Sequence, residues 1–114
     1  MAIHYLEIVT ADVEATCAAL EKVHAVRFGK PVAELGQART ATLRGGGEIG
    51  VRAPLRPDEA PVVRPYALVD DLDAALEAVT ASGGTIALGA TPMAGRGRFA
   101  IYVQGGVDYG LWQK

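Results

Sequence analysis

The sequence predicts an α+β fold in which two βαβββ modules in one chain form a curved mixed sheet with helices outside. Two observations indicate an internal duplication. The Gly-Gly pairs at 45–46 and 105–106 stand sixty positions apart, and the residues flanking them agree with that offset. The run Asp12-Val13-Glu14-Ala15 matches Asp71-Leu72-Asp73-Ala74 fifty-nine positions later, which we attribute to one residue deleted before the second helix.

The first half begins with a β-branched and aromatic run at 3–9 that is typical of a strand. Asp12 is expected to cap a helix that runs to about His24. Cys17 lies on the apolar face of this helix and is expected to be a small core residue. Strands are expected at 31–36, 38–44 and 48–52, and the Gly-Gly pair supplies the turn between the last two.

The second half repeats this order. A strand is expected at 62–69, and Pro65 within it indicates a bulge or an edge position, since proline cannot donate to a sheet ladder. Asp71 is expected to cap the second helix, which ends at the glycines 83–84. Strands follow at 85–89, 97–103 and 108–113. The whole of 1–114 is thus one domain, with modules 1–53 and 62–114 joined by a Pro-rich linker at 54–61.

The composition and net charge exclude several classes of function. The chain has 114 residues, of which 50% are hydrophobic, so it is expected to form one packed globule. Eleven basic against thirteen acidic residues give a net charge of -2, which argues against nucleic acid as a partner. One cysteine and the absence of a signal sequence or long apolar run predict a cytoplasmic protein without a membrane partner.

Two segments point to a known family. The opening strand His4-Tyr5-Leu6-Glu7-Ile8-Val9 precedes an Asp-started helix, and the hairpin from 97 to 112 closes the chain. This pattern resembles the vicinal oxygen chelate superfamily, also called the glyoxalase, bleomycin-resistance and extradiol dioxygenase group, over nearly the whole chain. The resemblance implies a homodimer. Two such modules paired about a pseudo-twofold axis form a concave trough, where small molecules bind.

In enzymes of that superfamily, His, Gln or Glu side chains on the first and last strands of each module hold a divalent metal. Counting from the helix aspartates and through the last hairpin places those positions at Tyr5, Pro65, Arg52 and Trp112. Proline, guanidinium and indole are not metal ligands, so we predict no metal and no cofactor. A register shifted by one residue would instead present His4. Glu7, Glu48 and Asp108 are the other strand groups that could be recruited, but no single strand parity brings three of the four together with a partner on the other module.

Strand alternation places the side chains of Tyr5 and Glu7 on the face of the trough. The same alternation places the side chains of Arg52 and Trp112 on that face. In one interpretation Glu7 is a general base or binds a ligand, Arg52 holds an anionic or carbonyl group, and Trp112 stacks on a ring. In the other, Glu7 and Arg52 form a structural ion pair and Trp112 fills the core.

The segment Gly95-Arg96-Gly97-Arg98 lacks a full phosphate-binding fingerprint, so we expect a loop that covers one end of the trough. The predicted function is metal-free binding of an aromatic or antibiotic-like metabolite, as in bleomycin-resistance proteins. The alternatives are a glyoxalase- or dioxygenase-like enzyme with a degenerate metal site or with Glu7 as base, and a structural module without a ligand. The expected ligand-binding residues are Tyr5, Glu7, Arg52, Tyr66, Met93, Arg98 and Trp112.

Overall fold

A computed structural model describes all residues of the chain, 1–114. They form two compact units. The first unit is Tyr5–Val63, and the second is Arg64–Lys114 together with Met1–His4. Neither helix has the length and apolar character needed to cross a membrane.

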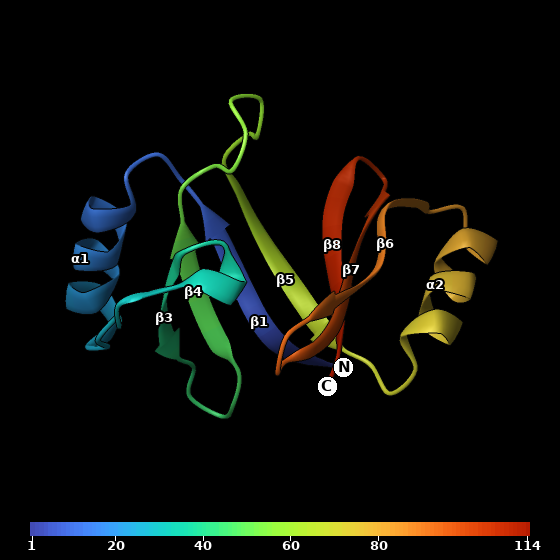
Figure 1. Cartoon of the computed structure of the whole chain (residues 1–114), viewed down its shortest axis with the longest axis horizontal. Helices are drawn as coiled ribbons and strands as arrows, with labels where there is room; N and C mark the ends of the chain where they lie inside the picture. Colours follow the sequence, from blue (N-terminus) through green and yellow to red (C-terminus); the bar gives the residue numbers. More distant parts are fainter. The chain divides into compact units, whose positions relative to one another are not determined.

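The first unit is a small mixed sheet covered by one helix (Figure 1). Its strands run in the order β2-β3-β4-β1, with β1 parallel to β4 and the other neighbours antiparallel. A short 3-10 turn, Ala33–Leu35, follows β2. The elements are β1 (Ala2–Val9, which starts in the second unit), α1 (Val13–His24), β2 (Pro31–Val32), β3 (Ala38–Thr42) and β4 (Glu48–Arg52).

The core of the first unit lies between α1 and the sheet. Three side chains are buried there: Cys17 from α1, Phe28 from the loop after α1, and Val51 from β4. Ile8 of β1 packs against them. Because strand residues alternate between faces, the residues next to Ile8 belong to the opposite face. Glu7 is therefore directed away from the helix, and it is buried.

The second unit repeats this arrangement. Its strands run in the order β5-β8-β7-β6, with β5 parallel to β8 and antiparallel pairs beyond it. Leu72 and Val79 of the helix pack on Ala100 and Leu111 of the sheet. The elements are β5 (Val62–Leu68, in this unit from Arg64), α2 (Leu72–Ala81), β6 (Thr85–Met93), β7 (Gly97–Gln104) and β8 (Val107–Gln113).

The two helix starts differ. Asp71 caps α2 as predicted, since its carboxylate accepts a hydrogen bond from the backbone N–H of Ala74 at 3.0 Å. Asp12 stands at the predicted N-cap position of α1, and α1 ends at His24 as expected, but the Asp12 side chain makes no capping hydrogen bond. The backbone N–H of Asp12 donates to the hydroxyl of Thr10 at 3.2 Å, and its backbone angles differ from those of Asp71.

Three strand predictions need adjustment. The run expected at 31–36 is a strand only at Pro31–Val32, because the chain then turns through a 3-10 helix that ends at Gly36 with φ +66°. β6 extends to Met93, four residues beyond the expected end. Pro65 lies inside β5, and the defined register with β8 starts at the next residue, Tyr66.

Candidate functional site

Two matching hydrogen bonds show which residues of the two units are equivalent. The backbone N–H of Thr10 donates to the carbonyl of Arg52 at 2.9 Å, and that of Val69 donates to the carbonyl of Trp112 at 2.8 Å. Arg52 and Trp112 are therefore equivalent, as the offset of sixty predicts. The first strands, however, already match at an offset of fifty-nine, so the one-residue slip lies after the second helix begins.

This equivalence corrects one of the positions compared with the family's metal ligands. The equivalent of Tyr5 in β5 is Arg64, and the expected Pro65 is wrong by one residue. Sequence reasoning missed Arg64, although the offset between the two helix aspartates would have found it.

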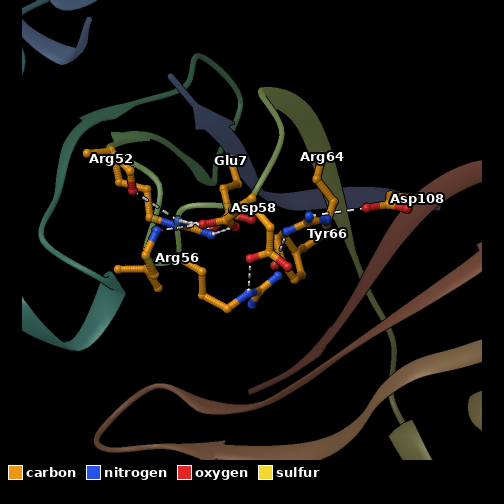
Figure 2. A network of polar contacts seen from close by, with 10 residues as sticks. Glu7, Arg52, Arg56, Asp58, Arg64, Tyr66 and Asp108 are labelled. Carbon is orange, nitrogen blue, oxygen red and sulfur yellow. Dashed lines mark hydrogen bonds and ion pairs between the residues drawn. The ribbon is translucent and has the colours of Figure 1, made fainter. Parts of the chain in front are cut away.

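The first unit contains a buried cluster of charges on the face of its sheet away from α1. Figure 2 shows Glu7 and Arg52 of this cluster. Arg52, 6% exposed, donates from Nε to Glu7 Oε2 at 2.8 Å. Its Nη1 and Nη2 donate to the two carboxylate oxygens of Glu59 at 2.9 and 2.8 Å, and Nη1 also donates to the carbonyl of Ala53 at 3.1 Å. Four of the five guanidinium N–H groups are thus engaged within the protein.

Arg52 and Glu59 of this cluster shift each other's pKa values. Hydrogen bonding to Glu59, with further support from the charge of Glu7, raises the pKa of Arg52 above its ordinary value despite burial. The Arg52 guanidinium in turn lowers the pKa of Glu59 from 4.5 to about 2, against the opposing effect of burial.

Glu59 also fixes the segment between the two modules. Its Oε1 accepts the backbone N–H of Leu55 at 2.7 Å, so the chain after β4 is held back onto the strand. Sequence reasoning missed this role because a charged residue in a Pro-rich stretch is typical of a solvated linker. The bidentate geometry joins Arg52 to Glu59, and Glu7 forms with Arg52 the ion pair that the second interpretation expects.

The lowered pKa of Glu59 predicts acid sensitivity. A carboxyl group whose pKa is lower in the folded protein contributes stability above its unfolded value of 4.5, and this contribution is lost as the pH falls toward about 2. We therefore expect the difference in melting temperature between the native chain and a Glu59→Gln variant to shrink over that interval.

Thermal unfolding followed by circular dichroism at several pH values checks this. Asp58→Asn is the matched control, because the ion pair of Asp58 with Arg56 is largely exposed. A difference for Glu59→Gln that stays constant with pH would contradict the assignment.

In both units a tyrosine lies across a glycine of the neighbouring strand. A Cβ atom at Gly50 would overlap the phenol of Tyr5, and one at Gly110 would overlap the ring of Tyr66. Tyr5 and Tyr66 are 4% and 3% exposed. The glycines thus admit an aromatic ring on the face opposite the helix in each unit.

The second unit carries an aromatic cluster on this face, formed by His4, Tyr66, Phe99 and Trp112. The Trp112 ring centroid lies 5.2 Å from that of His4, 5.7 Å from that of Tyr66 and 5.9 Å from that of Phe99. Trp112 is 3% exposed, and its indole N–H donates to the carbonyl of Arg96 at 2.7 Å. The turn between β6 and β7 is therefore anchored to the aromatic cluster.

Arg64 is a second buried guanidinium, 7% exposed, and it belongs to the same unit as the aromatic cluster. It donates to Asp108 Oδ2 at 3.2 Å and to the Tyr66 hydroxyl at 3.4 Å (Figure 2). Both distances are long for their donor types, and the Asp108 side chain is 38% exposed.

The remaining candidates lie at one end of the second unit. Arg98 donates to Gln113 Oε1 at 3.0 Å and lies 3.5 Å from a carboxylate oxygen of Asp73. Because Gln113 Oε1 also accepts the first N–H of α2, Arg98 helps join β7 to that helix. Met93 ends β6, where its carbonyl accepts the backbone N–H of Arg96 at 2.9 Å.

The residues at the compared metal positions do not fit a divalent cation. In the first unit they are Tyr5 and Arg52, and in the second they are Arg64 and Trp112. Guanidinium carries a positive charge and has no acceptor, while indole N–H only donates. Nowhere in the structure do three or more His, Cys, Asp or Glu side chains form a group that could hold a metal ion.

The sequence matches no protein-family model and no curated protein. Its structure is similar to solved ones. A hypothetical protein from Bacillus halodurans aligns with a TM-score of 0.72 and 14% identity, over 99% of this chain and 94% of that one. Methylmalonyl-CoA epimerase from Mycobacterium tuberculosis aligns with a TM-score of 0.70 and 18% identity, over 97% of this chain and 86% of the epimerase.

A methylmalonyl-CoA epimerase (S115T) from Streptomyces coelicolor, solved in complex with 2-nitronate-propionyl-CoA, aligns with a TM-score of 0.68 and 18% identity. It is covered to 94%, and this chain to 100%. These epimerases belong to the vicinal oxygen chelate superfamily. The α+β prediction of two βαβββ modules is therefore confirmed, and the chain has the glyoxalase-like fold of that superfamily.

Proposed function

We propose that the chain binds a small planar organic molecule without a metal ion of the family type. The observation that supports this most directly is the chemistry at the compared metal positions. Arg52 and Arg64 have no acceptor atom to offer a cation, and Trp112 brings an aromatic ring. Arg64 and Trp112 suit an organic ligand.

The aromatic cluster of the second unit is the surface we assign to the ligand. Trp112, Tyr66 and Phe99 offer ring faces and edges for stacking, and Arg64 adds a guanidinium beside them. Because Trp112 is nearly buried, a ligand that reaches its ring must displace groups that cover it, and we expect the turn held by the carbonyl of Arg96 to be among them. Met93 and Arg98 flank that turn and would border the opening.

We assign Arg52 a structural role. Its engagement with Glu7, Glu59 and Ala53 leaves one N–H for any further group, so ligand binding would have to disrupt the buried cluster. Glu7 retains a second possible use. A buried carboxylate can act as a base, and the epimerases that share this fold are isomerases, which favours proton transfer as the second candidate function.

Trp112 makes the proposal directly testable, because it is the only tryptophan of the chain. Titration with planar aromatic compounds, such as quinones and aromatic antibiotics, is expected to quench its fluorescence saturably. A compound that binds only the folded state must also raise the melting temperature. Tyr66→Leu should weaken the binding affinity by about tenfold, which corresponds to the loss of one ring contact and its burial, and should reduce the rise in melting temperature accordingly.

The matched control is Tyr109→Leu, because Tyr109 lies outside the aromatic cluster: it stacks on Tyr102 at 5.1 Å and is 38% exposed.

Stoichiometric nickel, zinc, manganese or iron in the purified protein would contradict the metal-free proposal. Deuterium exchange at the α-carbon of an acyl-CoA, abolished by Glu7→Gln and retained in Glu59→Gln, would instead support the isomerase candidate. Absence of binding in the whole panel would overturn the aromatic assignment.

We also propose a homodimer in a reducing, cytoplasmic setting, on the grounds given by the sequence. The buried free thiol of Cys17 is compatible with this setting.

A further inference from the structure

A cavity that is open to solvent lies wholly within the first unit, beside the start of α1 and the β2–β3 edge. Its volume is about 530 Å³, within the range of roughly 300–1,000 Å³ that is typical of small-molecule sites. Val13, Phe28 and Pro31 supply apolar wall, while Lys30, Gln37 and Arg39 supply polar groups. None of these residues belongs to the aromatic cluster of the second unit.

The wall at Phe28 and Gly29 is rigidly preformed, since all four backbone polar groups of these residues are hydrogen-bonded. The N–H of Phe28 donates to Glu21 at 2.8 Å, and that of Gly29 donates to the carbonyl of Thr40 at 2.8 Å. Arg39 binds both carbonyls, from Nε to Gly29 at 2.8 Å and from Nη2 to Phe28 at 3.2 Å. A ligand would therefore meet an ordered surface.

The charged residues that line the cavity, Glu14, Lys30 and Arg39, give it a net positive charge, although the chain as a whole is acidic. Arg39 pairs with Glu14 at 2.7 Å, so these two lining charges offset each other. Lys30 is exposed at the rim and makes no ion pair or side-chain hydrogen bond. One uncompensated ammonium beside an apolar wall favours an organic anion over a cation or a neutral ligand.

Gln37 adds an independent sign of function. It has φ +67°, a left-handed conformation that costs a residue other than glycine of order 1–3 kcal/mol and is concentrated at ligand-binding positions. The preceding residue, Gly36, shares this conformation without that cost. A glycine at 37 would relieve the strain, yet the chain carries an amide that can donate and accept hydrogen bonds in the cavity wall.

We propose that this cavity binds a small organic anion, with the apolar part of the ligand against Phe28 and Val13 and its carboxylate or phosphate facing Lys30 and Gln37. The site is distinct from the one assigned under the proposed function, and either can exist without the other.

Nuclear magnetic resonance titration of the nitrogen-labelled full chain tests this with three probes: phenylacetate, phenyl phosphate and the neutral phenylacetamide. The anions are expected to shift the backbone amide signals of Gly29, Lys30 and Gln37 saturably, and the tighter of the two identifies the preferred headgroup. Phenylacetamide should bind at least about fivefold more weakly, the value of one exposed charge interaction.

Two variants and one control separate binding from folding. Lys30→Gln should weaken binding of the anions about fivefold, whereas Lys22→Gln, on the last turn of α1 and outside the lining, should not. Gln37→Gly should weaken binding while leaving the melting temperature unchanged or raised, which a purely structural residue would not do.

The proposal is overturned if the anions cause no saturable shift at these amides up to about 10 mM, a concentration that detects even weak complexes. It is also overturned if phenylacetamide binds as well as phenylacetate. A shift of the Trp112 indole signal in place of the Gly29 and Lys30 signals would assign the probe to the second unit and likewise reject this site.

Discussion

Arg52→Met is expected to lower the free energy of unfolding by about 3–5 kcal/mol, the cost of removing one partner from a buried ion pair. The side chain of Glu59 is only 10% exposed, so its carboxylate would remain buried without its bidentate partner, and Glu7, 9% exposed, would lose its hydrogen bond to Arg52. The linker would also lose its attachment to β4. Urea denaturation at neutral pH measures the loss.

The control for this variant is Arg56→Met, three residues into the linker. Arg56 pairs with Asp58 at 3.2 Å, but the two side chains are 68% and 83% exposed. Removing an exposed ion pair should change stability by less than about 1 kcal/mol. Equal effects of the two variants would mean that the Glu7, Arg52 and Glu59 cluster is not desolvated as described.

Gly110→Ala is expected to destabilise the chain by about 2–3 kcal/mol, the usual cost of forcing extra atoms into a packed site. A methyl group at this position would overlap Cγ, Cδ2 and Cε2 of Tyr66. The Tyr66 ring is confined by Phe99 and Trp112, with centroids at 6.0 and 5.7 Å, so it has little room to withdraw. The same denaturation experiment measures this loss.

Gly89→Ala is the matched control, since Gly89 lies in a strand of the same unit, has no positive φ, and would place its methyl group in open space. Its effect should be small. In the background of Tyr66→Leu, Gly110→Ala should cost clearly less, because the ring that it displaces is gone. Strict additivity of the two changes would show that ring and glycine do not interact.

The two units show how one backbone plan can serve different chemistry. Arg52 and Trp112 occupy equivalent positions at the ends of β4 and β8, as their matching carbonyl hydrogen bonds show. The first is tied into a charge cluster, and the second into an aromatic cluster. Tyr5 and Tyr66, although not equivalent in sequence, both lie across glycines. We infer that the charge cluster at Arg52 stabilises the first unit, whereas the aromatic cluster at Trp112 is the surface assigned to the planar ligand of the proposed function.

The sequence by itself determined the module order, both helices and the closing hairpin, because these depend on local periodicity and turn chemistry. Gly105 and Gly106 form the expected two-residue turn, with φ of +60° and +77°. The pairing of Glu7 with Arg52 was also foreseeable, since strand alternation places both on the face away from the helix.

Only the tertiary structure decided which groups meet across long separations in the chain. The role of Glu59 depends on the linker folding back onto β4. The role of Arg64 depends on the register of β5, because a shift of one residue would move its side chain to the other face of the sheet. The cavity beside Phe28 likewise arises where Arg39 binds the loop after α1. A local pattern sets which face a side chain occupies, but its partners depend on how distant segments pack, and no short-range preference encodes that.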